Sequence, residues 1–293
     1  MKKCVGVIGL GLLGSALCER LCAAGFSVLG FDTDSAARQR CQQRGVALAE
    51  DAGGVLSSVS TCILSLPDSD VVRIVLTENV PPAGLVILDT TTGQPAAIRQ
   101  LATELAERQV GYFEANVAGS SEQLRAGRAT LFVGGNADAL AEQSAVLTAL
   151  SPQQFHVGQC GDAATLKLVH NLILGLNRAV LAEGLALGER CGLDPRQMLD
   201  VLQSTPAASA AMLTKGLKII SRDYQPQARL AQHLKDVRLI LDQADAVQAI
   251  TPLSKLHRQL LERADELGFG ASDNSAIAEV FRETPDENSD RLC

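Results

Sequence analysis

The run Val5-Gly6-Val7-Ile8-Gly9-Leu10-Gly11-Leu12-Leu13-Gly14-Ser15-Ala16-Leu17 decides the fold of the N-terminal half. A short β-rich apolar segment ends in three glycines spaced G-x-G-x-x-G, and a helical pattern begins at once. Gly9 permits the tight turn, Gly11 lets a pyrophosphate approach bare backbone, and Gly14 lets the helix pack closely on the strand. Free N–H groups at the helix N-terminus would face the phosphates. The spacing predicts a dinucleotide-binding βαβ unit; an ordinary glycine turn in a buried αβ unit is the alternative.

A second strand pattern, Val28-Leu29-Gly30-Phe31-Asp32, ends in an acid 18 residues after Gly14. A carboxylate at this position accepts hydrogen bonds from the adenosine ribose hydroxyls. It also repels the 2′-phosphate of NADP. A second acid, Asp34, follows closely, and the nearest basic residues lie on the next helix. We therefore expect NAD as the cofactor, with NADP less favoured.

Composition narrows the class of protein. The chain has 293 residues, of which 46% are hydrophobic and 20% charged, so it is long enough for two globular domains. The formal charge is 26 − 33 = −7, and aromatic residues make up only 3%. This balance argues against a nucleic acid or an anionic membrane as partner. A small anionic substrate needs only a local cationic site and stays possible.

The eight cysteines have no C-x-x-C and no zinc-type spacing, so we expect no metal site and a reducing, cytoplasmic environment. Lys2 and Lys3 before an apolar run resemble a secretory signal, but the glycines of that run and the charges of Glu19 and Arg20 fit a strand and helix better. No segment reaches the roughly 18 uninterrupted apolar residues that span a membrane.

Strand and helix patterns alternate in the first half, which predicts an α/β Rossmann-type, doubly wound sheet over residues 1–161. The predicted strands are 4–8, 27–31, 61–65, 85–88, 110–113 and 130–133. The predicted helices of this half are 12–24, 35–44, 69–76, 94–108 and 136–149.

Strand signals stop near residue 162, which predicts an all-α C-terminal domain over 162–282. Asp162 is expected to cap a long helix that ends near Cys191, before Gly192. Further helices are predicted at 195–203, 207–221, 229–247, 252–267 and 274–282. The segment 207–221, rich in alanine and leucine, suggests a face buried against another subunit. Residues 283–293 are polar and aperiodic, so a loose tail is expected.

Lys167 lies in a segment that is apolar nearly all round, where a lysine needs a partner or a role. His170 and Asn171 follow it three and four residues later, on the same helical face. Burial lowers the pKa of a lysine from its usual value of about 10.4, toward a range that suits proton transfer. The pattern favours Lys167 as a general acid/base; the alternative is a structural lysine, and His170 is better explained as a packed polar residue.

Six segments occur in the order and form of the motifs of one enzyme family: Gly9–Gly14, Leu66-Pro67-Asp68, Asp89-Thr90-Thr91, Gly161–Asn171, Leu234-Lys235-Asp236 and Asp273-Asn274-Ser275-Ala276-Ile277. They resemble the β-hydroxyacid dehydrogenases, a family with 3-hydroxyisobutyrate dehydrogenases, tartronate semialdehyde reductases and 6-phosphogluconate dehydrogenases. The resemblance covers roughly residues 4–282. It implies hydride transfer between a nicotinamide and a short 3-hydroxy acid or its semialdehyde, in a homodimer or homotetramer.

The resemblance, together with the glycine motif, assigns site residues. Catalysis falls to Lys167, with Asn171 orienting the substrate. Cofactor-binding residues are expected to be Gly9, Gly11, Leu12, Leu13, Gly14, Asp32, Leu66, Pro67, Thr91 and Lys235. Substrate-binding residues are expected to be Ala118, Gly119, Ser120, Lys167 and Asn171. For Lys235 the alternative is a surface pair with Asp236.

Departures from the family pattern concern the substrate. The family's loop D-x-P-V-S-G-G reads here Glu114-Ala115-Asn116-Val117-Ala118-Gly119-Ser120, so the usual serine is Ala118. His170 stands where the family often has asparagine, and Gly161-Asp162-Ala163 lacks a second glycine. Two alternatives stay open: an imine reductase-like enzyme, against which Lys167 argues, and a non-catalytic dinucleotide-binding protein.

Overall fold

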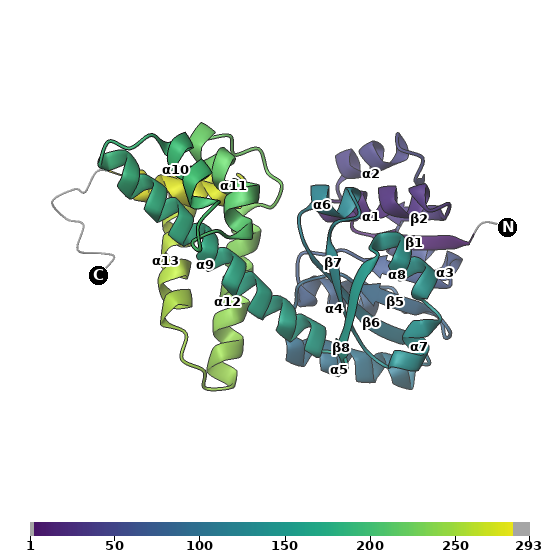
Figure 1. Cartoon of the computed structure of the whole chain (residues 1–293). Helices are drawn as coiled ribbons and strands as arrows, with labels where there is room; N and C mark the ends of the chain where they lie inside the picture. The colour runs from purple at the N-terminus through teal and green to yellow at the C-terminus, as the bar shows by residue number, and fades with distance from the viewer. Residues whose placement is uncertain (1–2, 284–293) are drawn as a thin grey trace. The chain divides into compact units, whose positions relative to one another are not determined.

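The computed structural model describes residues 3–283. The chain divides into two compact units, Met1–Lys167 and Leu168–Cys293. Figure 1 shows a sheet covered by helices in the first unit and helices alone in the second. The division falls within helix α9 (Asp162–Arg190), close to the predicted start of the helical domain at 162. The loose tail predicted for 283–293 lies outside the described residues except for Glu283.

The first unit contains one eight-stranded sheet in the order β3-β2-β1-β4-β5-β6-β7-β8. Every neighbouring pair is parallel except β6 and β7, which confirms the expected Rossmann-type, largely parallel sheet. The strands are β1 (Cys4–Ile8), β2 (Ser27–Phe31), β3 (Ala47–Leu48), β4 (Thr61–Leu64), β5 (Val86–Asp89), β6 (Gly111–Ala118), β7 (Thr130–Gly134) and β8 (Gln153–Gly158).

Helices cover both faces of this sheet (Figure 1). They are α1 (Leu12–Ala23), α2 (Ser35–Gln42), α3 (Ala52–Ser58), α4 (Ser69–Glu78), α5 (Pro95–Glu107), α6 (Ser121–Arg125), α7 (Ala137–Ala141) and α8 (Ser144–Leu150). The prediction of a single helix at 136–149 is wrong, because the helix is interrupted between Ala141 and Ser144 and forms α7 and α8 instead. The two outermost strands were not predicted: β3 has two residues, and β8 carries exposed polar side chains, so neither has an apolar run.

The sheet order reverses between β1 and β4, which are neighbours although two strands separate them in the sequence. Both strands are almost completely buried, because helices pack on each face. Ligands of doubly wound sheets bind at the carboxyl ends of the strands at such a switch point. The loops that follow β1, β4 and their neighbours are therefore the region to search for a site.

The second unit is helical, as predicted, and has its own apolar core. Beyond α9 its elements are α10 (Pro195–Leu202), α11 (Ala210–Ser221), α12 (Leu230–Ala246), α13 (Pro252–Ala264), a π-helical segment (Asp265–Phe269) and a 3₁₀ segment (Asn274–Arg282). Within residues 3–283, no helix is long and apolar enough to cross a membrane.

Asp162 does not cap α9, contrary to the sequence expectation. It is the first residue of the helix, and its carboxylate accepts a hydrogen bond from the N–H of Gln159, which precedes the helix. A carboxylate within the first turn faces backward rather than toward the free N–H groups of N2 and N3, which a side chain at the preceding position would reach. That preceding residue is Gly161, which has no side chain, so the groups are satisfied from elsewhere in the unit.

Candidate active site

The glycine loop between β1 and α1 has the geometry of a phosphate cradle. Gly9 has φ +93°, and a Cβ there would collide with the carbonyl oxygen of Ser65. A Cβ on Gly14 would collide with the carbonyl oxygen of Gly9, whereas a Cβ on Gly11 would meet nothing within 4 Å. No side chain caps the N-terminus of α1. Two glycines thus shape the turn, the third leaves open space, and the helix N-terminus faces that space, which fits a pyrophosphate.

Asp32 follows β2 and is tied to this loop. Its Oδ2 accepts the N–H of Leu10 at 2.6 Å, and its Oδ1 accepts the N–H of Asp34 at 2.8 Å. Arg38 lies back over the same turn, with its Nη1 2.5 Å from the carbonyl oxygen of Asp32. Arg40 pairs with Asp34 at 3.7 Å. The carboxylate keeps lone pairs for ribose hydroxyls, and both nearby arginines are engaged with β2–α2 loop atoms.

Two further strand-end loops, after β4 and after β5, are joined to each other and to strand β6 through Thr91. The hydroxyl of Thr91 accepts the N–H of Leu66 at 3.1 Å, and its carbonyl oxygen accepts the side-chain amide of Asn116 at 2.8 Å. Leu66 and its neighbour Pro67 follow β4, and Thr91 follows β5. These bonds fix the loops after β4 and β5 to the middle of β6. Leu66, Pro67 and Thr91 therefore lie at the same sheet edge as the glycine loop.

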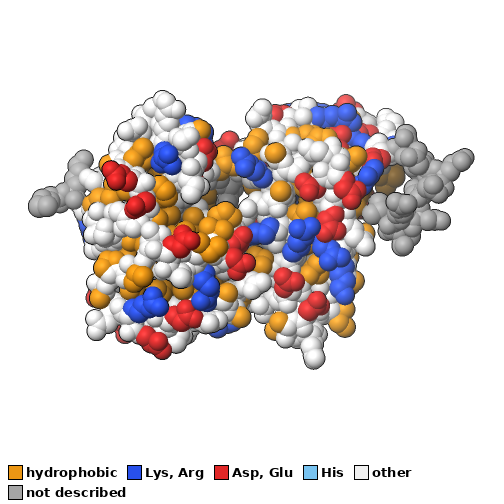
Figure 2. Space-filling model, turned by 180° about the vertical axis from the view of Figure 1, so that it is seen from behind, with side chains coloured by type: hydrophobic (Ala, Val, Ile, Leu, Met, Phe, Trp, Pro, Cys, Tyr) orange, Lys and Arg blue, Asp and Glu red, His pale blue; other side chains and the backbone are white. Residues whose placement is uncertain are grey.

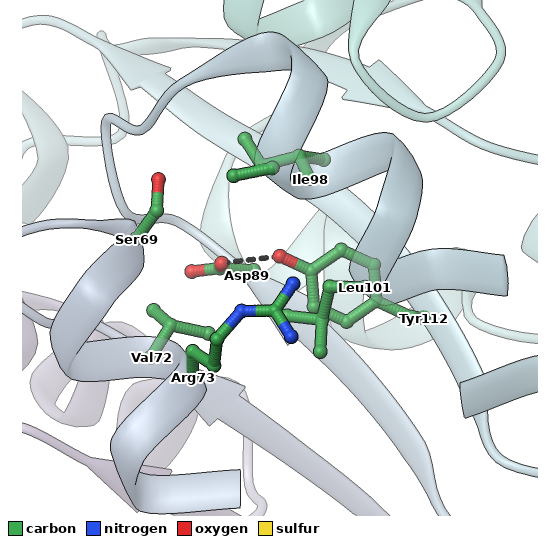
Figure 3. A pocket seen from close by; sticks show the side chains of 8 residues that line it. Ser69, Val72, Arg73, Asp89, Ile98, Leu101 and Tyr112 are labelled. Carbon is green, nitrogen blue, oxygen red and sulfur yellow. Dashed lines mark hydrogen bonds between the residues drawn. The ribbon is translucent and has the colours of Figure 1, made fainter. Parts of the chain in front are cut away.

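Behind this edge a small hollow opens between α4, α5 and the sheet (Figure 3). Asp89, the last residue of β5, points its carboxylate at Tyr112 and accepts the phenol O–H at 2.5 Å. Its other oxygen accepts the N–H of Thr91 at 2.9 Å. Burial, with the charge of Asp89, raises the pKa of Tyr112 well above its usual value. The buried carboxylate of Asp89 thus holds the backbone of the Thr91 loop in place through this hydrogen bond.

The proposed substrate loop begins where β6 ends, at Ala118. Gly119 has φ +151°. Ser120 caps the short α6: its hydroxyl accepts the N–H of Gln123 at 3.2 Å, and the side-chain oxygen of Gln123 accepts its N–H at 2.8 Å. The Ser120 N–H is therefore already engaged, whereas its hydroxyl hydrogen can still be donated.

Lys167 is 8% exposed, and its Nζ donates a hydrogen bond to the carbonyl oxygen of Val117 at 2.7 Å. The ammonium group is thereby held beside the residue that precedes Ala118 in β6. The structure thus brings Lys167 and the substrate loop together. The burial expected from the apolar character of the helix is present.

Glu114, in the middle of β6, holds the N-terminus of α9. Its Oε2 accepts the N–H of Gly161 at 2.5 Å, and its Oε1 accepts the N–H of Ala164 at 2.7 Å. Burial raises the pKa of Glu114 to about 7; the N–H donors oppose this shift and Asp89 adds to it. A Cβ on Gly134, in β7, would lie 2.5 Å from Oε2, so a glycine makes room for the carboxylate.

Asn171 belongs to the second unit, where its side-chain amide donates to Oδ2 of Asp236 at 2.9 Å. The Nδ1 of His170 lies 3.0 Å from the side-chain oxygen of Asn171. Lys235 forms an ion pair with Asp236 at 3.0 Å. These four residues make one polar cluster in the helical unit. The pair of Lys235 with Asp236, which was the alternative to a cofactor-binding role for Lys235, is present.

The predicted residues thus fall into two groups. Those of the first unit lie at the carboxyl edge of its sheet and around Lys167, and Asn171 and Lys235 meet through Asp236 in the second unit. Neither the role of Glu114 nor the contact of Asp236 with Asn171 was predicted from the sequence. A charged residue inside an apolar strand was the available signal for Glu114. No group of three or more His, Cys, Asp or Glu side chains in residues 3–283 is arranged to hold a metal ion.

Two family models match the chain. Residues 4–158 match the NAD-binding domain of 6-phosphogluconate dehydrogenase. Residues 161–281 match a domain described as NAD-binding of NADP-dependent 3-hydroxyisobutyrate dehydrogenase. The two matches meet at the start of α9.

Several curated proteins are similar over nearly the whole chain. The 2-(hydroxymethyl)glutarate dehydrogenase of Eubacterium barkeri is 30% identical, with 95% of each chain covered. The L-threonate dehydrogenase of Cupriavidus necator is 28% identical, with 96% of this chain and 97% of that protein covered. The cytokine-like nuclear factor N-PAC of Anopheles gambiae is 26% identical over 93% of this chain, which spans only 49% of N-PAC.

Solved structures agree in fold. A 3-hydroxyisobutyrate dehydrogenase from Salmonella typhimurium superposes with a TM-score of 0.88 at 25% identity, covering 95% of this chain and 100% of that one. An imine reductase from Pseudomonas sp. gives a TM-score of 0.64 at 21% identity, with 96% and 99% covered, and so shares the fold alone. From these matches and the glycine cradle, the chain belongs to the 3-hydroxyisobutyrate dehydrogenase family of NAD(P)-binding hydroxyacid dehydrogenases.

Proposed function

We propose that this protein transfers hydride between NAD and a short 3-hydroxy acid, or the corresponding semialdehyde, with Lys167 as general acid/base. One observation carries the proposal: Lys167 is buried, and its Nζ is held by the carbonyl oxygen of Val117, directly beside the loop Ala118–Ser120. A buried lysine fixed at the sheet edge where a dinucleotide cradle opens is suited to proton transfer.

The proton follows a short path in this mechanism. A bound nicotinamide supplies the acceptor or donor of hydride at the hydroxyl-bearing carbon. On oxidation, neutral Lys167 takes the hydroxyl proton at Nζ while the C–H bond gives up its electron pair as hydride. On reduction, protonated Lys167 returns that proton to the carbonyl oxygen. The Val117 carbonyl oxygen orients Nζ in both directions, because it accepts a hydrogen bond from an N–H that Nζ keeps whether the lysine is neutral or protonated.

The substrate carboxylate is proposed to lie on the loop Ala118–Ser120. With alanine at 118 and the Ser120 N–H engaged by Gln123, the proposed donors are the backbone N–H of Gly119 and the Ser120 hydroxyl, whose oxygen already accepts one bond. Asn171 is proposed to orient the substrate, and Asp236 fixes its side-chain amide. This donor set differs from the family's usual loop, which favours a substrate that differs as well.

NAD is the proposed cofactor. Asp32 and Asp34 place two carboxylates at the end of β2, and Arg38 and Arg40 contact that same turn rather than extending from it. Lys235 is proposed to reach the cofactor from the helical unit. The solved structure of Psf3, similar in fold with a TM-score of 0.86 at 24% identity over 94% of this chain and 99% of that one, contains NADP+, so this fold also accommodates NADP+.

We propose further that residues 1–161 and 162–282 act as cofactor and substrate domains of a cytoplasmic homodimer or homotetramer. Large apolar side chains are exposed on the helical unit, among them Val180 and Leu187 of α9 and Leu213 and Leu217 of α11. Figure 2 shows apolar side chains exposed between charged ones on the face that it draws. Light scattering at micromolar concentration tests the assembly.

A panel of substrates with both nicotinamides tests the function. It contains 3-hydroxyisobutyrate, L-threonate, 2-(hydroxymethyl)glutarate, the corresponding semialdehydes and a cyclic imine, and reduced nicotinamide is followed by its absorbance. Turnover of a hydroxy acid is expected, and turnover of the imine alone would point to an imine reductase. Nucleotide binding without turnover of any member would favour a non-catalytic dinucleotide-binding protein.

A further inference from the structure

The first turn of α9 is capped from a strand rather than by the residue that precedes the helix. That residue is Gly161, which has no side chain, so the free N–H groups at this end need acceptors from elsewhere. The carboxylate of Glu114, in β6, accepts two of them, the N–H of Gly161 at 2.5 Å and that of Ala164 at 2.7 Å. One side chain, 1% exposed, thus holds the start of α9.

The carboxylate of Glu114 has little room to move. Its partner across β6 and β7 is Gly134. A Cβ on Gly134 would lie 2.5 Å from Oε2 of Glu114 and 3.0 Å from the carbonyl oxygen of Gln159, so a glycine is needed to leave the carboxylate in place. Because protein interiors are closely packed, the carboxylate cannot be displaced without moving the first turn of α9 as well.

Lys167 is tied to the same strand one turn further along α9. It follows Ala164 by three residues, about 4.5 Å along the helix axis. Its Nζ donates to the carbonyl oxygen of Val117, three residues after Glu114 in β6. A single contact would let the helix turn about it, whereas two contacts fix both the place and the rotation of this turn. All of these residues belong to the first unit.

We propose that Glu114 is a positioning residue for proton transfer: it fixes the start of α9 so that Nζ of Lys167 stays beside the loop Ala118–Ser120. The inference rests on the proposed function, in which Lys167 is the general acid/base. The lysine side chain is flexible, so Nζ keeps one place only if the backbone that carries it is fixed too. A misplacement of about 1 Å can cost about 10²-fold in rate. Glu114 therefore acts on the reaction through Lys167.

The first experiment measures kcat and KM at pH 8, where the carboxyl of Glu114 is ionised because its pKa is about 7. Glu114→Gln keeps the shape of the side chain but replaces one acceptor oxygen by an NH₂ group, so one of the two N–H groups loses its acceptor. It should lower kcat by about 10- to 100-fold and leave KM for the hydroxy acid and for NAD little changed, because a displaced Nζ weakens the transition state alone.

Glu107→Gln, the same change at an exposed position of α5, is the matched control and should leave kcat unchanged. Circular dichroism checks that each variant is folded. Gly134→Ala replaces Glu114→Gln if that variant does not fold, because its Cβ displaces the carboxylate while Glu114 and Lys167 both remain. An unaltered kcat in the folded variant overturns the proposal.

A double variant tests whether Glu114 acts through Lys167. In the Lys167→Met background, Glu114→Gln should cause no further loss of kcat, because no Nζ is left to be placed. A further loss as large as that in the wild-type background would mean that Glu114 acts by another route, and would overturn the proposal.

The coupling of the two residues can also be measured without turnover. Urea unfolding at pH 8 gives the free energy of unfolding of the wild type, the two single variants and the double variant. Because both side chains hold the same turn, Glu114→Gln should change this free energy by different amounts in the wild-type and Lys167→Met backgrounds. Equal changes overturn the positioning role even if hydroxy acids are turned over. Unequal changes with no turnover of any panel member would instead reject the proposed function.

Discussion

The carboxylate of Glu114 accepts the backbone N–H of Ala164 at 2.7 Å, which fastens the first turn of α9 to the middle of β6. Lys167 is three residues further along the same helix, and its Nζ returns to β6 at Val117. The acid and the lysine therefore hold the helix to the strand at two points. The position of Nζ relative to the loop Ala118–Ser120 depends on both contacts.

The raised pKa of Glu114 predicts a pH-dependent stability. The fold keeps this carboxyl protonated up to about pH 7, whereas the unfolded chain releases the proton near 4.5. The contribution is complete below 4.5 and is lost as pH rises through 7, by about 3 kcal/mol in all. Glu114→Gln should flatten the free energy of unfolding between pH 5 and 8, measured in urea.

The control for this measurement is Glu104→Gln, which removes an exposed acid paired with Arg73. It should keep the wild-type dependence on pH. Other titratable groups that act on Glu114, namely Asp89, Tyr112 and Cys160, are unchanged in both variants, so their contributions cancel. A wild-type slope in Glu114→Gln would mean that another group is responsible.

Lys167→Ala should lower kcat by 10²–10⁴-fold, the usual cost of removing a general acid/base. The dissociation constant of NAD, measured by calorimetry, should change little, because Nζ of Lys167 is bonded to Val117 in β6, whereas the glycine cradle and Asp32 follow β1 and β2. Lys255→Ala, at an exposed position of α13, serves as control. Near-normal turnover of the alanine variant would exclude Lys167 from the mechanism.

The central strands could be predicted because they are buried on both faces and read as short runs of Val, Ile and Leu. The strand β8 could not, since Gln153 and Gln154 lie at a sheet edge where no apolar run is needed. The burial of Lys167 was visible as one charge in an apolar helix. The contact between Glu114 and Ala164, which holds that helix to β6, could not be predicted. The two residues lie 50 positions apart, and such a contact leaves no periodic signal in the sequence.

Arg178 illustrates the same limit in the helical unit. In the sequence it is one arginine in a long helix, for which a solvated side chain is the ordinary expectation. Only the packing of α9 on the other helices shows that it is buried and that Asp273, its nearest acid, is already held by Lys215. The contact of Asp236 with Asn171 was not predicted for a comparable reason, since the two residues lie on different helices and 65 positions apart in the sequence.

Asp273→Asn should destabilise the protein by about 3–5 kcal/mol, because it leaves the ammonium of Lys215 buried without a counter-ion. The charge of Arg178 adds to the cost, since Asp273 is also the acid that attracts it. Urea unfolding followed by circular dichroism measures the change. Glu262→Gln, which breaks the exposed pair with Arg238, should cost less than about 1 kcal/mol. Equal losses in the two variants would contradict the role assigned to burial.

Cofactor preference depends on Asp32. Its carboxylate is expected to accept the ribose hydroxyls of NAD and to repel the 2′-phosphate of NADP, so kcat/KM should favour NAD by at least tenfold, or about 1.4 kcal/mol. Asp32→Asn removes the charge but keeps one acceptor for the N–H groups of Leu10 and Asp34, so the loop should survive. The preference should then shrink several-fold through a better KM for NADP.

The variant Asp34→Asn separates the contribution of Asp34 to cofactor preference from that of Asp32. The Asp34 side chain caps α2 and pairs with Arg40, so its charge is partly compensated and its removal should change the preference less than removal of Asp32. Asp51→Asn, at the N-cap of α3, is the matched control, because it removes the charge of a capping acid away from the proposed ribose site while asparagine still caps the helix. The assignment of Asp32 is wrong if the wild type prefers NADP. It is also wrong if Asp32→Asn and Asp51→Asn leave the ratio equally unchanged, because repulsion of a dianion must respond to the charge.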